Sequence, residues 1–383
     1  MSKIKSFIAT VLVSLLIIGG VNLIRDIWQS ESEAELYDYA IPESGDGTGY
    51  YRHFYEELNS TEKTVYSIIL EEIYSQPDKI QIPVMDDGDL EKIFHAISYD
   101  NPDLFNLGLT CKTTTTSKKC YFTVDYTMSY NKYERYLNEV NEVVQTIVDG
   151  AMRYPDEYSR EKYVHDYIVN NCTYVSPTDD DNSSTVYGCL VEGRASCEGY
   201  SRSFQYILNK LNIDNRLVTG EGASEGTEYI PHMWNYVCIN ERWYFVDVTW
   251  DDPVGDGETL CHTYFNVTTS DILKKHRNIQ QNVPQCINTA DNYFVRENLY
   301  FTTGSGDTFS NKISNAVVNA VNRGDDYVEF RFSDIYVMDQ AYNSMFEVGI
   351  IFDAFRKAGL AYGNEVSVNY SRDDRMYTIV IYF

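Results

Sequence analysis

The sequence is short of positive charge. Its 383 residues contain 31 Lys and Arg against 57 Asp and Glu, which gives a formal net charge of −26 at pH 7. A protein that binds nucleic acid needs a basic face for the phosphates, so this balance argues against a nucleic-acid partner. An acidic, self-repelling surface is instead typical of a soluble domain.

Cysteine is absent before Cys111, which excludes a lipoprotein anchor, and no pair among the eight cysteines has the CxxC spacing of a zinc ribbon. Cys111 and Cys120 flank the segment KTTTTSKK, between the strand-like segments FNLGLT and YFTVDYT. A hairpin with that even loop could place the two thiols opposite each other. The pattern therefore leaves a cross-strand disulfide open.

Metal and phosphate motifs are lacking as well. Counted from Asp179 in the acidic loop TDDDNSS, an EF-hand needs glycine at Ser184 and glutamate at Leu190, so the pattern fails. The glycine-rich stretches GDGTG and TGSGDT predict turns, because neither follows a strand and opens a helix. We expect no required metal and no cofactor.

One long apolar run is present, at the N-terminus. Lys3 and Lys5 precede 18 uncharged residues from Phe7 to Ile24, enough to span a bilayer. A cleaved signal peptide is the alternative, although the segment GGVN matches a cleavage site poorly. The lysines before the run and the glutamates after it predict a cytoplasmic N-terminus. We expect a single-pass cell-membrane protein with an external C-terminal part, or a secreted protein if the segment is removed.

Composition and periodicity divide the chain into five parts. Asn59, with Glu62 three residues later, predicts a capped helix, and the segment DGDLEKIFHAI predicts a second one before the hairpin. After residue 286, helical and strand-like segments alternate. The expected parts are an anchor or signal segment at 1–30, a flexible acidic linker at 31–49, a helical and hairpin region at 50–135, a core at 136–286 and a small α/β unit at 287–383.

Cys197, in the segment GRASCEGYS, lies where a loop becomes a helix. Ser196 can cap that helix, and its apolar face is formed by Phe204, Ile207, Leu208 and Leu211. The positive end of a helix dipole favours the thiolate, which is the nucleophilic form of cysteine. Glycines at 193 and 199 allow close approach of another backbone or a substrate. The alternatives are a small buried residue and one half of a disulfide.

His232 and Asp247 belong to two alternating segments, HMWNYVCIN and ERWYFVDVTW, which predict a hairpin. With its turn at Asn240 and Glu241, the histidine and the aspartate become diagonal neighbours on one face, about 7–8 Å apart at the backbone. A carboxylate there can orient an imidazole, whereas an odd-length loop would put them on opposite faces. A solvated aspartate and a packed histidine are the alternative.

The other five histidines have weaker signals. His165, within the segment EKYVHDYIV, is expected to pack or pair on a helix. The sequence offers no evident partner for His53, His95, His262 or His276.

Together these segments resemble the transglutaminase-like superfamily, a branch of the papain-like cysteine enzymes. The resemblance rests on YGCLVEGRASCEGYSRSFQYILNKLNI and PHMWNYVCINERWYFVDVTWDDP, and it covers roughly residues 161–264. It implies Cys197 as nucleophile, His232 as general base and Asp247 as the residue that orients the base. Further matches to the family pattern, expected as scaffold, are Trp243, Trp250, Asp251, Asp252 and Pro253.

The resemblance implies an α+β fold, with a papain-like/transglutaminase-like core, a helical N-terminal region and a small C-terminal α/β unit. The backbone N–H of Cys197 is the expected first oxyanion donor, and Tyr187 is the candidate for a second. The expected reaction is acyl transfer through a thioester on protein or peptide substrates, cell-envelope proteins among them. Water as acceptor gives a protease or deamidase and a lysine amine gives a cross-linker. A non-catalytic adhesion or binding module that retains the fold is the alternative.

Overall fold

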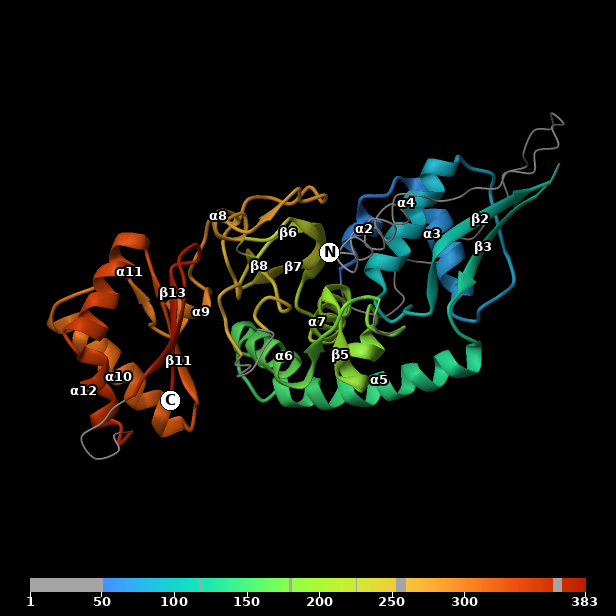
Figure 1. The fold of residues 1–383 in the computed structure, drawn as a ribbon. Coiled ribbons are helices and arrows are strands. Elements are labelled where there is room, and N and C mark those ends of the chain that lie inside the picture. Colours follow the sequence, from blue (N-terminus) through green and yellow to red (C-terminus); the bar gives the residue numbers. More distant parts are fainter. Residues whose placement is uncertain (1–50, 117–118, 179–180, 225, 253–259, 361–366) are drawn as a thin grey trace. The chain divides into compact units, whose positions relative to one another are not determined.

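The computed structural model describes residues 51–383, apart from 117–118, 179–180, 225, 253–259 and 361–366 (Figure 1). The apolar run at 7–24 and the acidic linker at 31–49 lie outside the described residues. Within the described part, no helix is both long enough and apolar enough to cross a bilayer. The chain forms two compact units. The first extends to Glu241 and includes Asn278–Asn282, and the second comprises Arg242–Arg277 and Val283–Phe383.

The N-terminal part of the first unit is helical and carries a small antiparallel sheet in the order β1-β3-β2. The expected capping box is confirmed, because Asn59 accepts hydrogen bonds from the N–H groups of Thr61 and Glu62 while Glu62 accepts from the N–H of Asn59. The elements are α2 (His53–Glu56), α3 (Ser60–Ile73), β1 (Ile80–Ile82), α4 (Asp87–Asp100), β2 (Leu107–Thr115) and β3 (Cys120–Tyr126).

The hairpin of β2 and β3 is confirmed, but it does not place its two cysteines opposite each other. Thr115 pairs with Cys120 next to the turn, whereas Cys111 pairs with Val124. A hydrogen bond from the N–H of Thr116 to the carbonyl of Lys119 closes the turn. Four residues of β2 lie between Cys111 and this turn, whereas Cys120 follows the turn directly. Both thiols are free and buried.

The rest of the first unit surrounds the buried helix α7. Strands β6 and β7 pair antiparallel, with Gly220 opposite His232, and β4 pairs parallel with β5. Nearly every residue of α7 after its first turn is buried, so other elements cover the helix on all sides. The elements are α5 (Tyr130–Ala151), α6 (Glu157–Asn171), β4 (Thr173–Tyr174), η1 (Gly188–Glu192), β5 (Arg194–Ala195), α7 (Cys197–Lys210), β6 (Asn215–Gly222) and β7 (Ile230–Ile239).

The apolar core of the N-terminal part continues into this region. It includes Leu217 of β6 and Met233 of β7, and Cys197 packs against it. The N-terminal helices therefore share a core with the two strands beside α7. This shared core places α4 close to Cys197, the candidate nucleophile of the sequence analysis.

The second unit begins with β8 (Arg242–Val246), α8 (Thr269–Ile272), β9 (His276–Arg277) and α9 (Tyr293–Arg296). Its C-terminal sheet has the order β10-β11-β13-β12, and helices pack against it (Figure 1). The remaining elements are β10 (Tyr300–Phe301), α10 (Asp307–Arg323), β11 (Tyr327–Phe332), α11 (Ile335–Tyr342), η2 (Asn343–Glu347), α12 (Ile350–Lys357), β12 (Asn369–Asp373) and β13 (Thr378–Tyr382). Mixed helices and antiparallel strands make the chain α+β, as expected from the sequence.

The register of the β2–β3 hairpin predicts which cysteine pair can close. In Thr115→Cys, a new thiol faces Cys120, because the Thr115 hydroxyl already lies 3.5 Å from the Cys120 sulfur. Under oxidising conditions the variant should form a disulfide between residues 115 and 120, which mass spectrometry of unreduced peptides detects. The wild-type chain is the control, and a Cys111–Cys120 disulfide in it would contradict the register.

Candidate active site

Cys197 is the first residue of α7 and is half-buried. Ser196 occupies the N-cap position as expected, but the expectation that its side chain caps the helix is wrong. The hydroxyl of Ser196 instead donates to the carbonyl of Ser183 at 3.3 Å and lies 3.2 Å from the hydroxyl of Ser184. The Ser196 side chain therefore accepts no hydrogen bond from the N–H groups at the start of the helix.

Gly199 allows the segment around residue 183 to approach the start of α7. A Cβ atom at this position would overlap the backbone carbonyl of Ser183 and the methyl group of Ala195. The N–H of Ser196 donates to the same carbonyl at 2.8 Å. The close backbone approach expected from the glycine is confirmed, and it holds the loop before Cys197 in one conformation.

Two buried hydrogen bonds join α7 to β7. The hydroxyl of Ser201 donates to the carbonyl of Met233 at 3.0 Å, and the amide of Asn235 donates to the carbonyl of Ser201 at 3.0 Å. Ser201 lies one helical turn after Cys197, and Met233 follows His232 in the strand. These bonds fix the helix that carries the thiol against the strand that carries the imidazole.

Cys197 and His232 line the same cavity, which has a volume of about 560 Å³. Helix α4 forms one wall with side chains that recur at helical spacing, and the segment from Leu104 to Leu109 adds apolar side chains. The α4 residues are Glu91, Phe94, His95, Ser98 and Tyr99. Sequence reasoning did not identify this wall, although the spacing of these residues is that of one helix face.

His95 is a neutral member of the cavity lining. Burial, together with the charges of Arg202 and Arg216, lowers the pKa of His95 to about 4. Its ring lies 3.9 Å from that of Tyr99, measured between centroids. Charged side chains of the lining include Glu91 of this same wall and the ion pair of Arg202 and Glu198, 2.8 Å apart.

The turn expected at Asn240 and Glu241 is present. β7 ends at Ile239, β8 begins at Arg242, and both intervening residues have positive φ, at 50° and 64°. Two consecutive residues with positive φ are typical of a two-residue hairpin turn.

Asp247 follows β8 in the second unit and is fully buried. One of its carboxylate oxygens lies 2.9 Å from Nε2 of His276, and the other accepts the N–H of Trp250 at 3.2 Å. Nδ1 of His276 lies 3.1 Å from the carbonyl of Ile272, so both ring nitrogens face an acceptor. The role of Asp247 in orienting His232 stays a prediction, and its partner His276 was missed by the sequence.

Tyr187 contacts helix α5. Its hydroxyl donates to a carboxylate oxygen of Glu139 at 2.9 Å, and its ring stacks on Tyr136 with centroids 3.6 Å apart. Burial and the hydrogen bond to Glu139 raise the pKa of Tyr187 above its usual value. Tyr187 is not among the residues that line the cavity with Cys197. An oxyanion role for Tyr187 stays a prediction that these contacts do not support.

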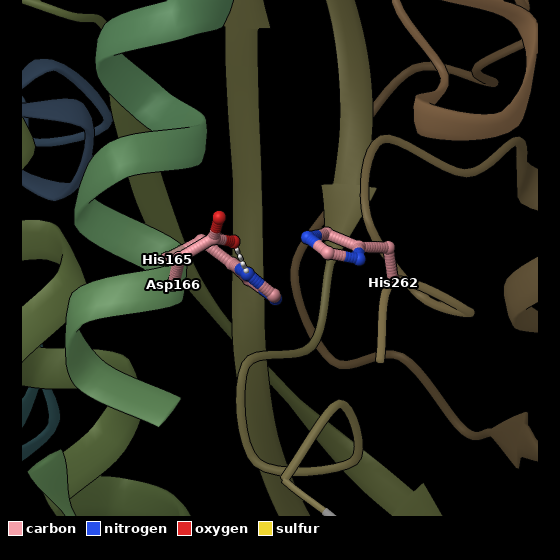
Figure 2. Close-up of side chains that lie close together, drawn as sticks. All are labelled: His165, Asp166 and His262. Carbon is pink, nitrogen blue, oxygen red and sulfur yellow. Dashed lines mark hydrogen bonds and ion pairs between the residues drawn. The ribbon is translucent and has the colours of Figure 1, made fainter. Parts of the chain in front are cut away.

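Other histidines are paired within their own units. His165 is buried, and its Nδ1 lies 3.1 Å from the carboxylate of Asp166 (Figure 2), which confirms the expected pairing on a helix. The sequence offered no partner for two more, yet His53 lies 2.6 Å from the carboxylate of Asp214 and His262 lies 2.8 Å from that of Glu329. These partners are distant in sequence, so no local pattern reveals them.

Two of the matched scaffold residues have clear structural contacts. A carboxylate oxygen of Asp251 accepts the N–H of Tyr264 at 2.9 Å, and the ring of Trp250 packs against that of His276 with centroids 4.4 Å apart. Pro253 lies outside the described residues.

Residues 141–248 match the family model of the transglutaminase-like superfamily. The matched segment contains Cys197, His232 and Asp247, so the resemblance read from the motifs is confirmed for this part of the chain. Comparison with curated proteins gave no match.

The solved structures that are similar to this chain include the following two. One is a TGase, at 18% identity over 49% of this chain and 54% of the other, with a TM-score of 0.27. The other is a candidate cysteine protease from Cytophaga hutchinsonii, at 16% identity over 29% of this chain and 37% of the other, with a TM-score of 0.25. The chain thus spans about half of the first structure and just over a third of the second.

The buried pair of His276 and Asp247 predicts a large local effect of removing the ring. Both side chains are fully buried. In His276→Ala, the carboxylate loses its buried bond to the imidazole, which costs about 3–5 kcal/mol. Hydrogen exchange should accelerate by roughly a hundredfold or more at Phe245 and Val267, whose N–H groups donate to each other's carbonyls.

His53→Ala is the matched control, because the Asp214 side chain of that pair is 40% exposed. Its loss should cost no more than about 1 kcal/mol at the nearby N–H of Cys238, which donates to the carbonyl of Asp214. Unchanged exchange at Phe245 and Val267 in His276→Ala would show that the pair does not stabilise the second unit.

Proposed function

Because the chain carries a domain of the transglutaminase-like superfamily, we propose that it catalyses cysteine-dependent acyl transfer or hydrolysis on protein or peptide substrates. The observation that carries the proposal is that Cys197, at the start of α7, and His232, on β7, line one cavity. A thiol and an imidazole on the same cavity are the two groups that a thioester mechanism requires.

In the proposed reaction, His232 takes the proton of the Cys197 thiol as the sulfur attacks the carbonyl carbon of a glutamine carboxamide or a peptide bond. The C–N bond breaks, the amine leaves with a proton delivered by His232, and a thioester remains on Cys197. His232 then takes a proton from water or from an amine, which attacks the thioester and releases the thiol. Asp247 is the proposed residue that holds the imidazole in the required tautomer.

The apolar part of the cavity lining favours an uncharged substrate side chain. Phe94 and the segment from Leu104 to Leu109 offer aromatic and aliphatic surface, and His95 is neutral because its pKa lies at about 4. Placing a charged side chain against apolar surface costs free energy unless a partner is present. Glutamine and apolar side chains are therefore the favoured groups against this part of the lining.

The other thiols provide a test of selectivity. Burial raises the pKa of Cys111 to about 12 and that of Cys238 to about 11, so these thiols should react slowly near neutral pH. In the purified full-length chain, iodoacetamide should therefore modify Cys197 first, as read by peptide mapping. Cys197→Ala and His232→Ala should each lower turnover of peptide amides by roughly a thousandfold or more.

Cys238→Ala is the matched control, because Cys238 is a half-buried thiol of β7 that is not among the residues lining the cavity. It should keep wild-type turnover. Product analysis with and without an added amine separates cross-linking from hydrolysis. Full turnover in Cys197→Ala would contradict the proposal. A labelled Cys197 with no turnover on any peptide amide would favour a binding module instead.

We also propose that the reaction takes place outside the cytoplasm, because an apolar segment at 7–24 would export the chain that follows it. An anchored protein should stay in the membrane fraction after a carbonate wash and begin at its encoded N-terminus. N-terminal sequencing of the mature protein is the measurement. A new N-terminus after Gly20 would show a cleaved signal, and recovery of the chain from the cytoplasm would contradict export.

A further inference from the structure

Glu91 of α4 is a half-buried carboxylate in the lining of the cavity that Cys197 and His232 share. Its side chain makes no hydrogen bond or ion pair with another described residue. The adjacent Lys92 bonds the carboxylate of Glu62 at 2.8 Å instead. The charge of Glu91 is therefore not neutralised within the described part of the chain.

The cations of the same lining are already bound. The guanidinium of Arg202 donates to the carboxylate of Glu198 at 2.8 Å and to the carbonyl of Ser98 at 2.6 Å. The ammonium group of Lys132 lies over the ring of Tyr136, 5.0 Å from its centroid, in a cation–π contact. A substrate cation can thus find an unpaired carboxylate here, whereas a substrate anion would have to compete for these two cations.

Apolar surface accompanies Glu91 in the lining. Phe94 follows one turn later on the same face of α4, and Leu109, which also lines the cavity, is 51% exposed. Ser98, whose carbonyl accepts from Arg202 of α7, lies seven residues after Glu91, about 10 Å along the helix axis. Glu91 therefore belongs to the end of the α4 wall that is distant from this junction with α7.

A lysine side chain combines the two properties that this surface selects. Its methylene stem can cover Phe94 and Leu109, while its ammonium group reaches the carboxylate of Glu91. A norleucine has a similar stem, but it would cover the apolar surface and leave the carboxylate without a partner in a drier place, which costs free energy. A glutamate would bring two like charges together.

We propose that Glu91 is a specificity-determining residue, which binds the ammonium group of a lysine side chain in the peptide substrate. The inference rests on the proposed function, because it places that substrate in the cavity of Cys197. Glu91 lies outside residues 141–248, so the preference belongs to the N-terminal region rather than to the matched family domain.

Paired peptide amides that differ only in lysine or norleucine at one position measure this preference in the purified full-length chain. The pair is moved through each position near the reacting carbonyl, with water as the acceptor. At one position the lysine peptide should have a kcat/KM roughly tenfold higher, mainly through KM, because a charge-assisted hydrogen bond forms on binding. The ratio should fall to about one in Glu91→Gln and below one in Glu91→Lys. A ratio of two peptides cancels any general change in the enzyme.

Asp181→Asn is the matched control. Asp181 also lines the cavity and makes no ion pair with another described residue, but its side chain is exposed. Because water and salt screen an exposed charge, this variant should keep the wild-type ratio. An equal loss of the ratio in Asp181→Asn would overturn the role of Glu91, because the effect would then come from the charge of the whole cavity.

An added alkylamine tests the other source of an ammonium group, the amine that accepts the acyl group. If Glu91→Gln weakened the use of added amines and left the lysine-to-norleucine ratio intact, the proposal for a substrate side chain would be overturned. A wild-type chain with no lysine preference at any position would overturn it as well.

Binding to Cys197→Ala separates this proposal from the proposed function. In calorimetry, this variant should bind the lysine peptide more tightly than the norleucine peptide, and the difference should disappear when Glu91→Gln is added. A difference that persists without the carboxylate would contradict the role of Glu91 and leave the proposed function in place. A difference that depends on Glu91, in a chain whose wild type turns over no peptide amide, would support the cation site and overturn the proposed reaction.

Discussion

The geometry of the candidate site depends on the contact between α7 and β7. Ser201 and Asn235 are almost completely buried, and their side chains bond the carbonyls of Met233 and Ser201. Buried polar groups are costly unless they are paired, so a shift of the helix along the strand would leave these groups without partners. The relative position of Cys197 and His232 is therefore set by interactions one helical turn away from the thiol, which leaves the cavity side of both residues open to a substrate.

The electrostatics of Asp247 add a second constraint. Its carboxylate bonds His276 through one oxygen and the N–H of Trp250 through the other. Because each carboxylate oxygen is bonded to a different group, these two bonds fix the orientation of the carboxylate. His276 thus helps to hold Asp247 in place inside the second unit.

The features that the sequence predicted correctly are local ones. The capping box at Asn59, the helix that begins at Cys197 and the turn at Asn240 and Glu241 depend on residues a few positions apart. A break between two helices in the C-terminal part has a local cause as well. Gly349, with φ of 94°, separates η2 from α12. Such a φ favours glycine, so the break could have been anticipated from that residue.

The features that the sequence missed arise from long-range packing. The register of β2 and β3 depends on which four residues close the turn, and an even loop is compatible with several choices. Ser196 has the right residue type for a cap, but the approach of Ser183 gives its hydroxyl another acceptor. His276 finds Asp247 from 29 positions away. The local sequence around Ser196 or His276 does not reveal the distant group that each side chain contacts, and the local sequence of the β2–β3 loop does not reveal its register.

The contribution of α4 shows how a site can extend beyond the domain that identifies its family. The matched segment supplies the thiol and the imidazole, while α4 supplies one wall of the cavity and is joined to α7 through Arg202 and Gln205. The proposed chemistry thus belongs to the matched segment, whereas the shape of the cavity next to it depends on a region that the family model does not cover. Because reaction and specificity reside in the site rather than in the fold, the substrate choice of the proposed reaction should depend on the N-terminal helices as much as on the matched segment.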